Sequence, residues 1–206
     1  MLHVSACLWD ATIRSAPASR CYDDSWAVKL YFGFQRNLTR PFRFVLFTER
    51  DRDLPAEIVQ ERLETLDPTW AAIVEPYKLN EPSILVGMDT VITGNIDHLA
   101  DYVLAGNKYA LPRDPYHHSI ACNGVQLVPA GMRHVFDDWR GENDMEWCRG
   151  FPHDFIDDLW PGHVVSYKKR VLHHGLGDAR IVYFHGTPKM HEIAHVPWVR
   201  DNWRDF

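Results

Sequence analysis

Apolar residues in the first half of the chain follow two spacings, which predict strands followed by helices. Leu2 to Trp9 is a short, nearly continuous apolar run, as expected of a buried strand. Asp23 to Leu38 has the spacing of an amphipathic helix that Asp23 or Asp24 can cap. The apolar residues on its face are Trp26, Ala27, Leu30, Tyr31, Phe34 and Leu38. Phe42 to Thr48 predicts a second strand, and Pro55 to Leu66 predicts a second helix that begins near Pro55.

The central segment Ile84 to Ile92 reads ILVGMDTVI and predicts a buried central strand with a polar interruption. The order strand, helix, strand, helix predicts a parallel sheet. Shorter strands are expected at 108–111, 124–128, 163–167 and 180–184, and helices near 97–104, 131–139 and 154–160. No repeat or linker divides the chain, so we expect residues 1–206 to form a single α/β domain.

The composition is that of one folded domain. The chain has 206 residues, of which 46% are apolar and 24% are charged. A net charge of −6 argues against general affinity for nucleic acid or an anionic membrane. Because there is no long apolar run and no basic leader, we expect a cytoplasmic protein without a membrane span. The four cysteines include no C-x-x-C pair, so reduced and mostly buried thiols are expected.

Two segments place polar side chains where a strand ends. Asp89 follows an apolar run, and burial of a carboxylate requires a cation, a metal or several donors, although local backbone donors can also satisfy it. The segment ARIVYFHGTPKMH runs from an apolar strand into His185, Gly186 and Lys189. Ligands bind at this edge of open parallel sheets. Gly186 would let backbone approach a phosphate, and Lys189 would neutralise a diphosphate; the alternative is a surface turn with an incidental lysine.

Five segments together carry a family resemblance. GMDTVITGNID resembles the acidic strand motif of GT-A glycosyltransferases, and HGTPK resembles the His-Gly-x-x-Lys motif of the glycogenin-like and lipopolysaccharide galactosyltransferase-like enzymes. CNGVQLVPAG, DMEW and VVSYK are similar to further segments of that family, in the same order. The resemblance covers most of the chain. It implies a GT-A, Rossmann-like domain with a mostly parallel sheet flanked by helices.

The resemblance also implies roles for single residues. Asp89 and His185 match the family's metal ligands, so Mn²⁺ or Mg²⁺ is an expected cofactor, and Lys189 matches its diphosphate-binding lysine. The other matched positions are Asn123 and Gly124 in the sugar pocket, Asp144 beside the transferred sugar or its acceptor, and Asp10 and Tyr22 beside the base and ribose. The implied activity is transfer of a sugar from a nucleotide-sugar, a UDP-sugar by resemblance, with retention at the anomeric carbon.

Two departures from the family pattern keep alternatives open. Gly87 stands where the family has its first metal-reaching acid, and Met145 stands where it has a glutamine. A weakened nucleotide-sugar or glycan-binding protein of the same fold is therefore one alternative. A metal-dependent hydrolase built on the twelve histidines is another, although the chain has no paired spacing such as H-E-x-x-H. The sequence predicts neither the sugar, nor the acceptor, nor the oligomeric state.

Overall fold

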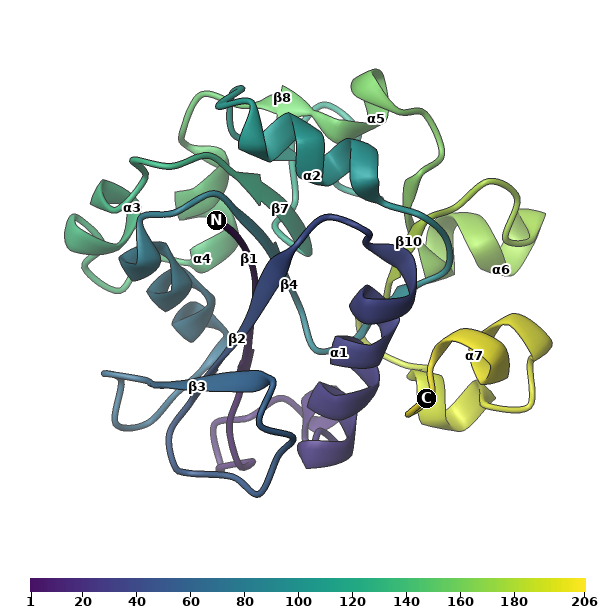
Figure 1. Ribbon diagram of the computed structural model, residues 1–206, viewed down its shortest axis with the longest axis horizontal. Helices are drawn as coiled ribbons and strands as arrows, with labels where there is room; N and C mark the ends of the chain where they lie inside the picture. Colours follow the sequence, from purple (N-terminus) through teal and green to yellow (C-terminus); the bar gives the residue numbers. More distant parts are fainter.

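A computed structural model describes residues 1–206 (Figure 1). The strands are β1 Leu2–Leu8, β2 Phe42–Thr48, β3 Ile58–Arg62, β4 Ser83–Val86, β5 Thr90–Ile92, β6 Ala110–Leu111, β7 Val125–Val128, β8 Asp154–Phe155, β9 Val164–Ser166 and β10 Ile181–Tyr183. The α-helices are α1 Asp24–Asn37, α2 Asp97–Leu104, α3 His134–Asp137, α4 Asp144–Arg149, α5 Ile156–Leu159, α6 Leu172–His174 and α7 Pro197–Asn202. Short 3₁₀ segments are η1 Pro17–Ser19, η2 Trp70–Leu79 and η4 Met190–Ile193, and η3 Tyr167–Val171 is a π-helical turn.

Two sheets organise the chain. The larger sheet has seven strands in the order β3-β2-β1-β4-β7-β6-β8, and the smaller has the order β5-β10-β9. Strands β3, β2, β1 and β4 are parallel, whereas β7 runs antiparallel to β4 and β6. The predicted α/β fold, with a mostly parallel central sheet flanked by helices, is confirmed. The carboxyl ends of β1, β2 and β4 therefore lie at one edge of the larger sheet.

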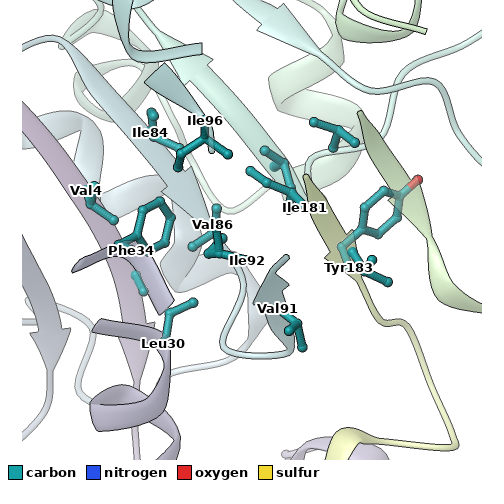
Figure 2. Close-up of a cluster of buried hydrophobic side chains, with 14 of the residues drawn as sticks. Val4, Leu30, Phe34, Ile84, Val86, Val91, Ile92, Ile96, Ile181 and Tyr183 are labelled. Atoms are coloured by element: carbon teal, nitrogen blue, oxygen red, sulfur yellow. The ribbon is translucent and has the colours of Figure 1, made fainter. Parts of the chain in front are cut away.

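Both faces of the larger sheet are covered, which explains why its strands are apolar at nearly every position. Side chains alternate along β1, so that Val4 belongs to the main core with α1 and α2, while Cys7 packs with residues of η2 on the other face. Figure 2 shows Phe34 of α1 beside Val4 and close to Val86 and Ile92, where the two sheets meet. The main core thus joins both sheets into one body.

Helix α1 is stabilised at its first turn as the sequence predicts. The Asp23 side chain accepts a hydrogen bond from the Ser25 backbone N–H at 2.9 Å and caps the helix. At the other end, the Asn37 carbonyl accepts a hydrogen bond from Ile96 N–H at 3.0 Å, which ties the helix to the start of α2. Helix α1 is therefore fixed at both of its ends.

The predicted helix at Pro55 to Leu66 is wrong, because Ile58–Arg62 forms strand β3. It pairs in parallel with β2, which would otherwise expose an unpaired strand edge. The Gln60 side chain accepts from the Arg52 backbone N–H and donates to the Arg52 carbonyl, both at 2.9 Å. Pairing with a neighbouring strand therefore outweighs the local helical pattern.

The expected single strand at Ile84 to Ile92 is also wrong, because the chain bends at Gly87, Met88 and Asp89. Strand β4 belongs to the larger sheet, and β5 pairs antiparallel with β10 in the smaller one. The Asp89 carbonyl accepts a hydrogen bond from Phe184 N–H at 2.9 Å, which extends this pairing beyond β10. Asp89 therefore lies at a bend between the two sheets, not within a strand.

Most of the remaining elements agree with expectation in kind, although residues 154–155 form a strand where a helix was expected. Helix α2 has its predicted bounds, and strands β6, β7, β9 and β10 fall inside their predicted segments. The helices expected near 131–139 and 154–160 shrink to α3 and to β8 followed by α5. All four cysteines are free thiols, and three of them are buried. None of the helices combines the length and apolar character needed to cross a membrane.

Candidate functional site

The centre of the candidate site is a carboxylate held by two distant segments. Asp89 accepts a hydrogen bond from the Tyr22 hydroxyl at 2.9 Å and forms an ion pair with the Lys189 ammonium through the same oxygen, Oδ2. The Lys189 ammonium also lies 5.4 Å from the centre of the Tyr22 ring. The Lys189 side chain is 4% exposed and that of Asp89 is 18% exposed. A buried ammonium needs an opposite charge, and Asp89 supplies it.

His185 lies next to this group at the end of β10. Its ring nitrogen Nε2 is 2.7 Å from the Ser166 hydroxyl at the end of β9, and its ring stands edge-on to Tyr116 at 5.4 Å between centres. Burial lowers the pKa of His185, and the charge of Lys168 lowers it further. At neutral pH the ring is therefore uncharged, and Nε2 either accepts a hydrogen bond from the Ser166 hydroxyl or donates one to it, depending on the tautomer. No hydrogen bond joins it to Asp89.

The turn after His185 is bordered by two lysines from η3. Gly186 has φ of 63°, and a Cβ atom there would lie 3.0 Å from the Lys168 ammonium. The Lys169 ammonium lies 4.2 Å from the centre of the Tyr116 ring. The left-handed backbone favours a glycine here, and the absence of a side chain leaves room for the Lys168 ammonium. Lys168 and Lys169 therefore border the turn from outside, while Lys189 lies buried beyond it.

A second polar pair lies at the start of β7, beside the bend. The Asn123 amide donates to the Asp144 carboxylate at 2.6 Å, and Asp144 begins helix α4. Burial raises the pKa of Asp144, and the hydrogen bond from Asn123 opposes part of that rise. The Gly124 carbonyl accepts from Gly87 N–H at 3.2 Å, which places this pair next to the bend that carries Asp89.

The loop after β1 forms one wall of an open cleft of about 410 Å³. Its lining residues are Asp10, Tyr22, Asp23, Asp24, Ser25, Arg50 and Arg52. Asp10 is exposed and accepts hydrogen bonds from Arg50 at 2.7 Å and Arg52 at 3.0 Å; the bond from Arg50 is the largest cause of its lowered pKa. Tyr22 thus connects this cleft to the Asp89 carboxylate.

The structure joins three of the predicted residues, Tyr22, Asp89 and Lys189, and it joins Asn123 with Asp144 in a second pair. It does not bond His185 or Asp10 to either group, because His185 pairs with Ser166 and Asp10 pairs with two arginines. Reasoning from sequence missed four side chains there, namely Ser166, Lys168, Lys169 and Tyr116. The VVSYK segment contains the first two, so a signal was present in the sequence. Nothing in a linear sequence showed that Ser166 would meet His185, because that contact depends on the parallel pairing of β9 with β10.

The residues present do not fit a divalent metal ion in this arrangement. One Asp89 oxygen is bonded to both Tyr22 and the Lys189 ammonium, and His185 Nε2 faces Ser166. Gly87 offers no ligand. No group of three or more His, Cys, Asp or Glu side chains is arranged to hold a metal. Hard divalent ions require several oxygen ligands, and this arrangement does not supply them.

Comparison with known proteins bears on the fold. No family model and no curated protein matches the chain. The galactosyltransferase LgtC in complex with donor and acceptor sugar analogues superposes with a TM-score of 0.58 at 9% identity, over 98% of this chain and 96% of LgtC. An active-site mutant of LgtC matches with a TM-score of 0.58 at 9% identity, over 91% of this chain and 89% of that one.

Two larger enzymes share the fold over part of their length. The glycosyltransferase GlyE of Streptococcus pneumoniae TIGR4 has a TM-score of 0.55 at 14% identity, over 91% of this chain and 55% of GlyE. The bifunctional glycosyltransferase WbbM has a TM-score of 0.57 at 10% identity, over 97% of this chain and 50% of WbbM. The likeness is one of fold, and it confirms the GT-A architecture that the sequence motifs implied.

Proposed function

We propose that this protein transfers a sugar from a nucleotide-sugar, most simply a UDP-sugar, to a glycan or other small acceptor. One observation carries the proposal. The ion pair of Asp89 and Lys189 lies at the edge of the sheet where α/β folds bind ligands, and Tyr22 donates a hydrogen bond to its carboxylate. The fold shared with LgtC, which was crystallised with donor and acceptor sugar analogues, supports the same activity class.

The donor would extend from the cleft to the glycine turn. In this arrangement the nucleoside lies in the open cleft beside Asp10 and Tyr22, and the diphosphate lies over Gly186. Cleavage of the bond between sugar and diphosphate leaves negative charge on the phosphate oxygens. The ammonium groups of Lys168 and Lys169 border that turn and would stabilise this charge as it develops.

The sugar would lie beside the pair of Asn123 and Asp144. Asn123 is buried and fixes the orientation of the Asp144 carboxylate by donating one hydrogen bond to it. Asp144 can then accept a hydrogen bond from a sugar hydroxyl and stabilise the positive charge that develops at the anomeric carbon. We propose retention of configuration. Met145 cannot make polar contacts in place of the family's glutamine, and it packs against the main core.

The activity is tested by incubating the purified protein with UDP-sugars and mixed sugar acceptors and measuring UDP release. Wild type should release UDP, and Asp144→Ala should lower the rate by about 10²-fold or more. Asp138→Ala, directly after α3, is the matched control and should match wild type, because Asp138 is exposed and lies outside the site. The anomeric configuration of the product, read by NMR, tests retention.

The same assay separates the alternatives. Tight binding of a nucleotide-sugar without turnover by wild type would favour the weakened binding protein. Release of monosaccharide or phosphate from simple esters without a nucleotide would favour the hydrolase, which the shared fold does not favour. A protein that neither binds nor turns over any nucleotide-sugar would refute the proposal.

A further inference from the structure

The Asp89 carboxylate already has a cation. Its Oδ2 atom accepts a hydrogen bond from the Tyr22 hydroxyl and forms an ion pair with the Lys189 ammonium. The Lys189 side chain is 4% exposed. An ammonium this deeply buried cannot leave its carboxylate without a large desolvation cost. The pair is therefore a permanent part of the folded protein, and its net charge is zero.

Gly87 leaves space for the Asp89 carboxylate in this arrangement. A Cβ atom at Gly87 would lie 2.8 Å from the other Asp89 oxygen, Oδ1, which is closer than side chains pack. An aspartate at position 87 would push Asp89 away from Tyr22 and Lys189, and it would add a second negative charge next to the first. The glycine thus does more than omit a ligand, because it leaves room for Asp89 to turn toward the lysine.

Further positive charge lies within reach of the same turn. The Lys168 ammonium lies 3.0 Å from where a Cβ atom of Gly186 would be, and Gly186 is exposed and has no side chain to cover it. The exposed Lys169 is anchored over Tyr116, and that ring in turn packs against His185. These two lysines border the position at which a diphosphate would meet the turn, so they can neutralise it directly.

We infer that the Lys189 ammonium takes the place of a divalent cation on Asp89, and that the protein binds a nucleoside diphosphate without metal. Lys168 and Lys169 supply the charge that contacts the phosphates. This inference rests on the proposed function, because it concerns the donor of the same site. It reverses the expectation of Mn²⁺ or Mg²⁺ drawn from the family resemblance.

The test is calorimetric titration of the metal-free full chain with UDP, first in EDTA and then with Mn²⁺ on the order of 1 mM. The dissociation constant should agree within about twofold between the two conditions, since no ligand set awaits the metal. Titration with Mn²⁺ alone, followed by electron paramagnetic resonance, should show no ordered protein site. Binding of UDP that appears only with Mn²⁺, or tightens by about tenfold or more, would overturn the inference while leaving the proposed function intact.

Absence of UDP binding under both conditions would instead refute the UDP-sugar donor of the proposed function, and this inference with it. Among variants, Lys168→Ala should weaken UDP binding by about tenfold in EDTA, the loss expected for one ammonium on a phosphate. Lys108→Ala is the matched control, because Lys108 is an exposed lysine paired with Asp154 away from the turn. Equal affinity of the two variants would show that Lys168 does not contact the phosphates.

A gain of metal dependence tests Lys189 itself. In the double variant Gly87→Asp, Lys189→Met, two carboxylates and His185 remain without the internal ammonium. Mn²⁺ should then tighten UDP binding by about tenfold or more relative to EDTA. The same response to Mn²⁺ in wild type and the double variant would show that Lys189 does not replace the cation. Should the double variant fail to fold, the wild-type titrations still decide the inference.

Discussion

The ion pair between Asp89 and Lys189 allows a quantitative prediction about stability. Lys189→Met removes the ammonium and keeps the length and apolar character of the side chain. The Asp89 carboxylate then retains only the hydrogen bond from Tyr22. Removing one partner of a fully buried ion pair costs about 3–5 kcal/mol, because an uncompensated charge stays behind. Asp89 is 18% exposed, so water recovers part of this loss, and we expect about 2–3 kcal/mol.

Removing the carboxylate instead of the ammonium should cost more free energy of unfolding. Asp89→Asn leaves the Lys189 ammonium, which is 4% exposed, without a charged partner, and we expect a loss of about 3–4 kcal/mol. In the double variant Asp89→Asn, Lys189→Met neither charge is present. It should therefore be more stable than the sum of the single losses predicts, by about 2 kcal/mol, which is the coupling energy of the pair.

Urea unfolding at pH 7, followed by far-ultraviolet circular dichroism and tryptophan fluorescence, measures these free energies provided that the slope with urea stays constant. The pair of Arg40 and Asp101 is the control, because both side chains are more than 40% exposed. Arg40→Met should leave the urea midpoint close to that of wild type. A Lys189→Met protein as stable as wild type, or a coupling energy below about 0.5 kcal/mol, would refute the buried pair on which the site is built.

Three further predictions concern other parts of the molecule. Asp144→Asn keeps an acceptor for the Asn123 amide and removes a buried charge, so it should raise the free energy of unfolding at pH 7 by on the order of 1 kcal/mol. Sugar transfer should be lost, and a variant less stable than wild type would contradict the prediction. His163 Nδ1 lies 3.0 Å from His98 Nε2, and burial lowers the pKa of both side chains below the ordinary 6.5. The unfolded chain therefore binds protons more readily, so stability should fall as pH drops below about 6.5, and His98→Asn should flatten that fall in urea titrations at several pH values. Arg52→Met should cost about 3 kcal/mol or more in urea unfolding, because this 1% exposed guanidinium holds three carboxylates together; a loss below about 1 kcal/mol would show that they do not depend on it.

The pattern of apolar residues predicted the fold class because both sheet faces are covered. Strand β2 has the predicted bounds, and α1 begins at its predicted cap. Such elements bury one face or both along their whole length, so their periodicity is strong. The segment 58–62 carries a weaker pattern, and its conformation is set by the open edge of β2 beside it.

The candidate site was predicted by residue type more than by contact. Asp89 needed a partner because an unpaired carboxylate is costly to bury, and that argument holds for any fold. Its partner was not evident, since Tyr22 is 67 residues away and Lys189 is 100 residues away in the sequence. The resemblance brought both lysine and aspartate to the same region, but it assigned Asp89 to a metal and not to the lysine.

The sequence by itself therefore determined which segments are buried, where β1, α1, β2 and α2 lie, and which polar residues follow the strand ends. Those properties depend on local spacing and on the cost of burying polar groups. Only the tertiary structure decided that residues 84–92 divide between two sheets at Gly87 and that the Lys189 ammonium lies on the Asp89 carboxylate. Both outcomes depend on the pairing of β5 with β10, a contact between segments about 90 residues apart that no local pattern encodes.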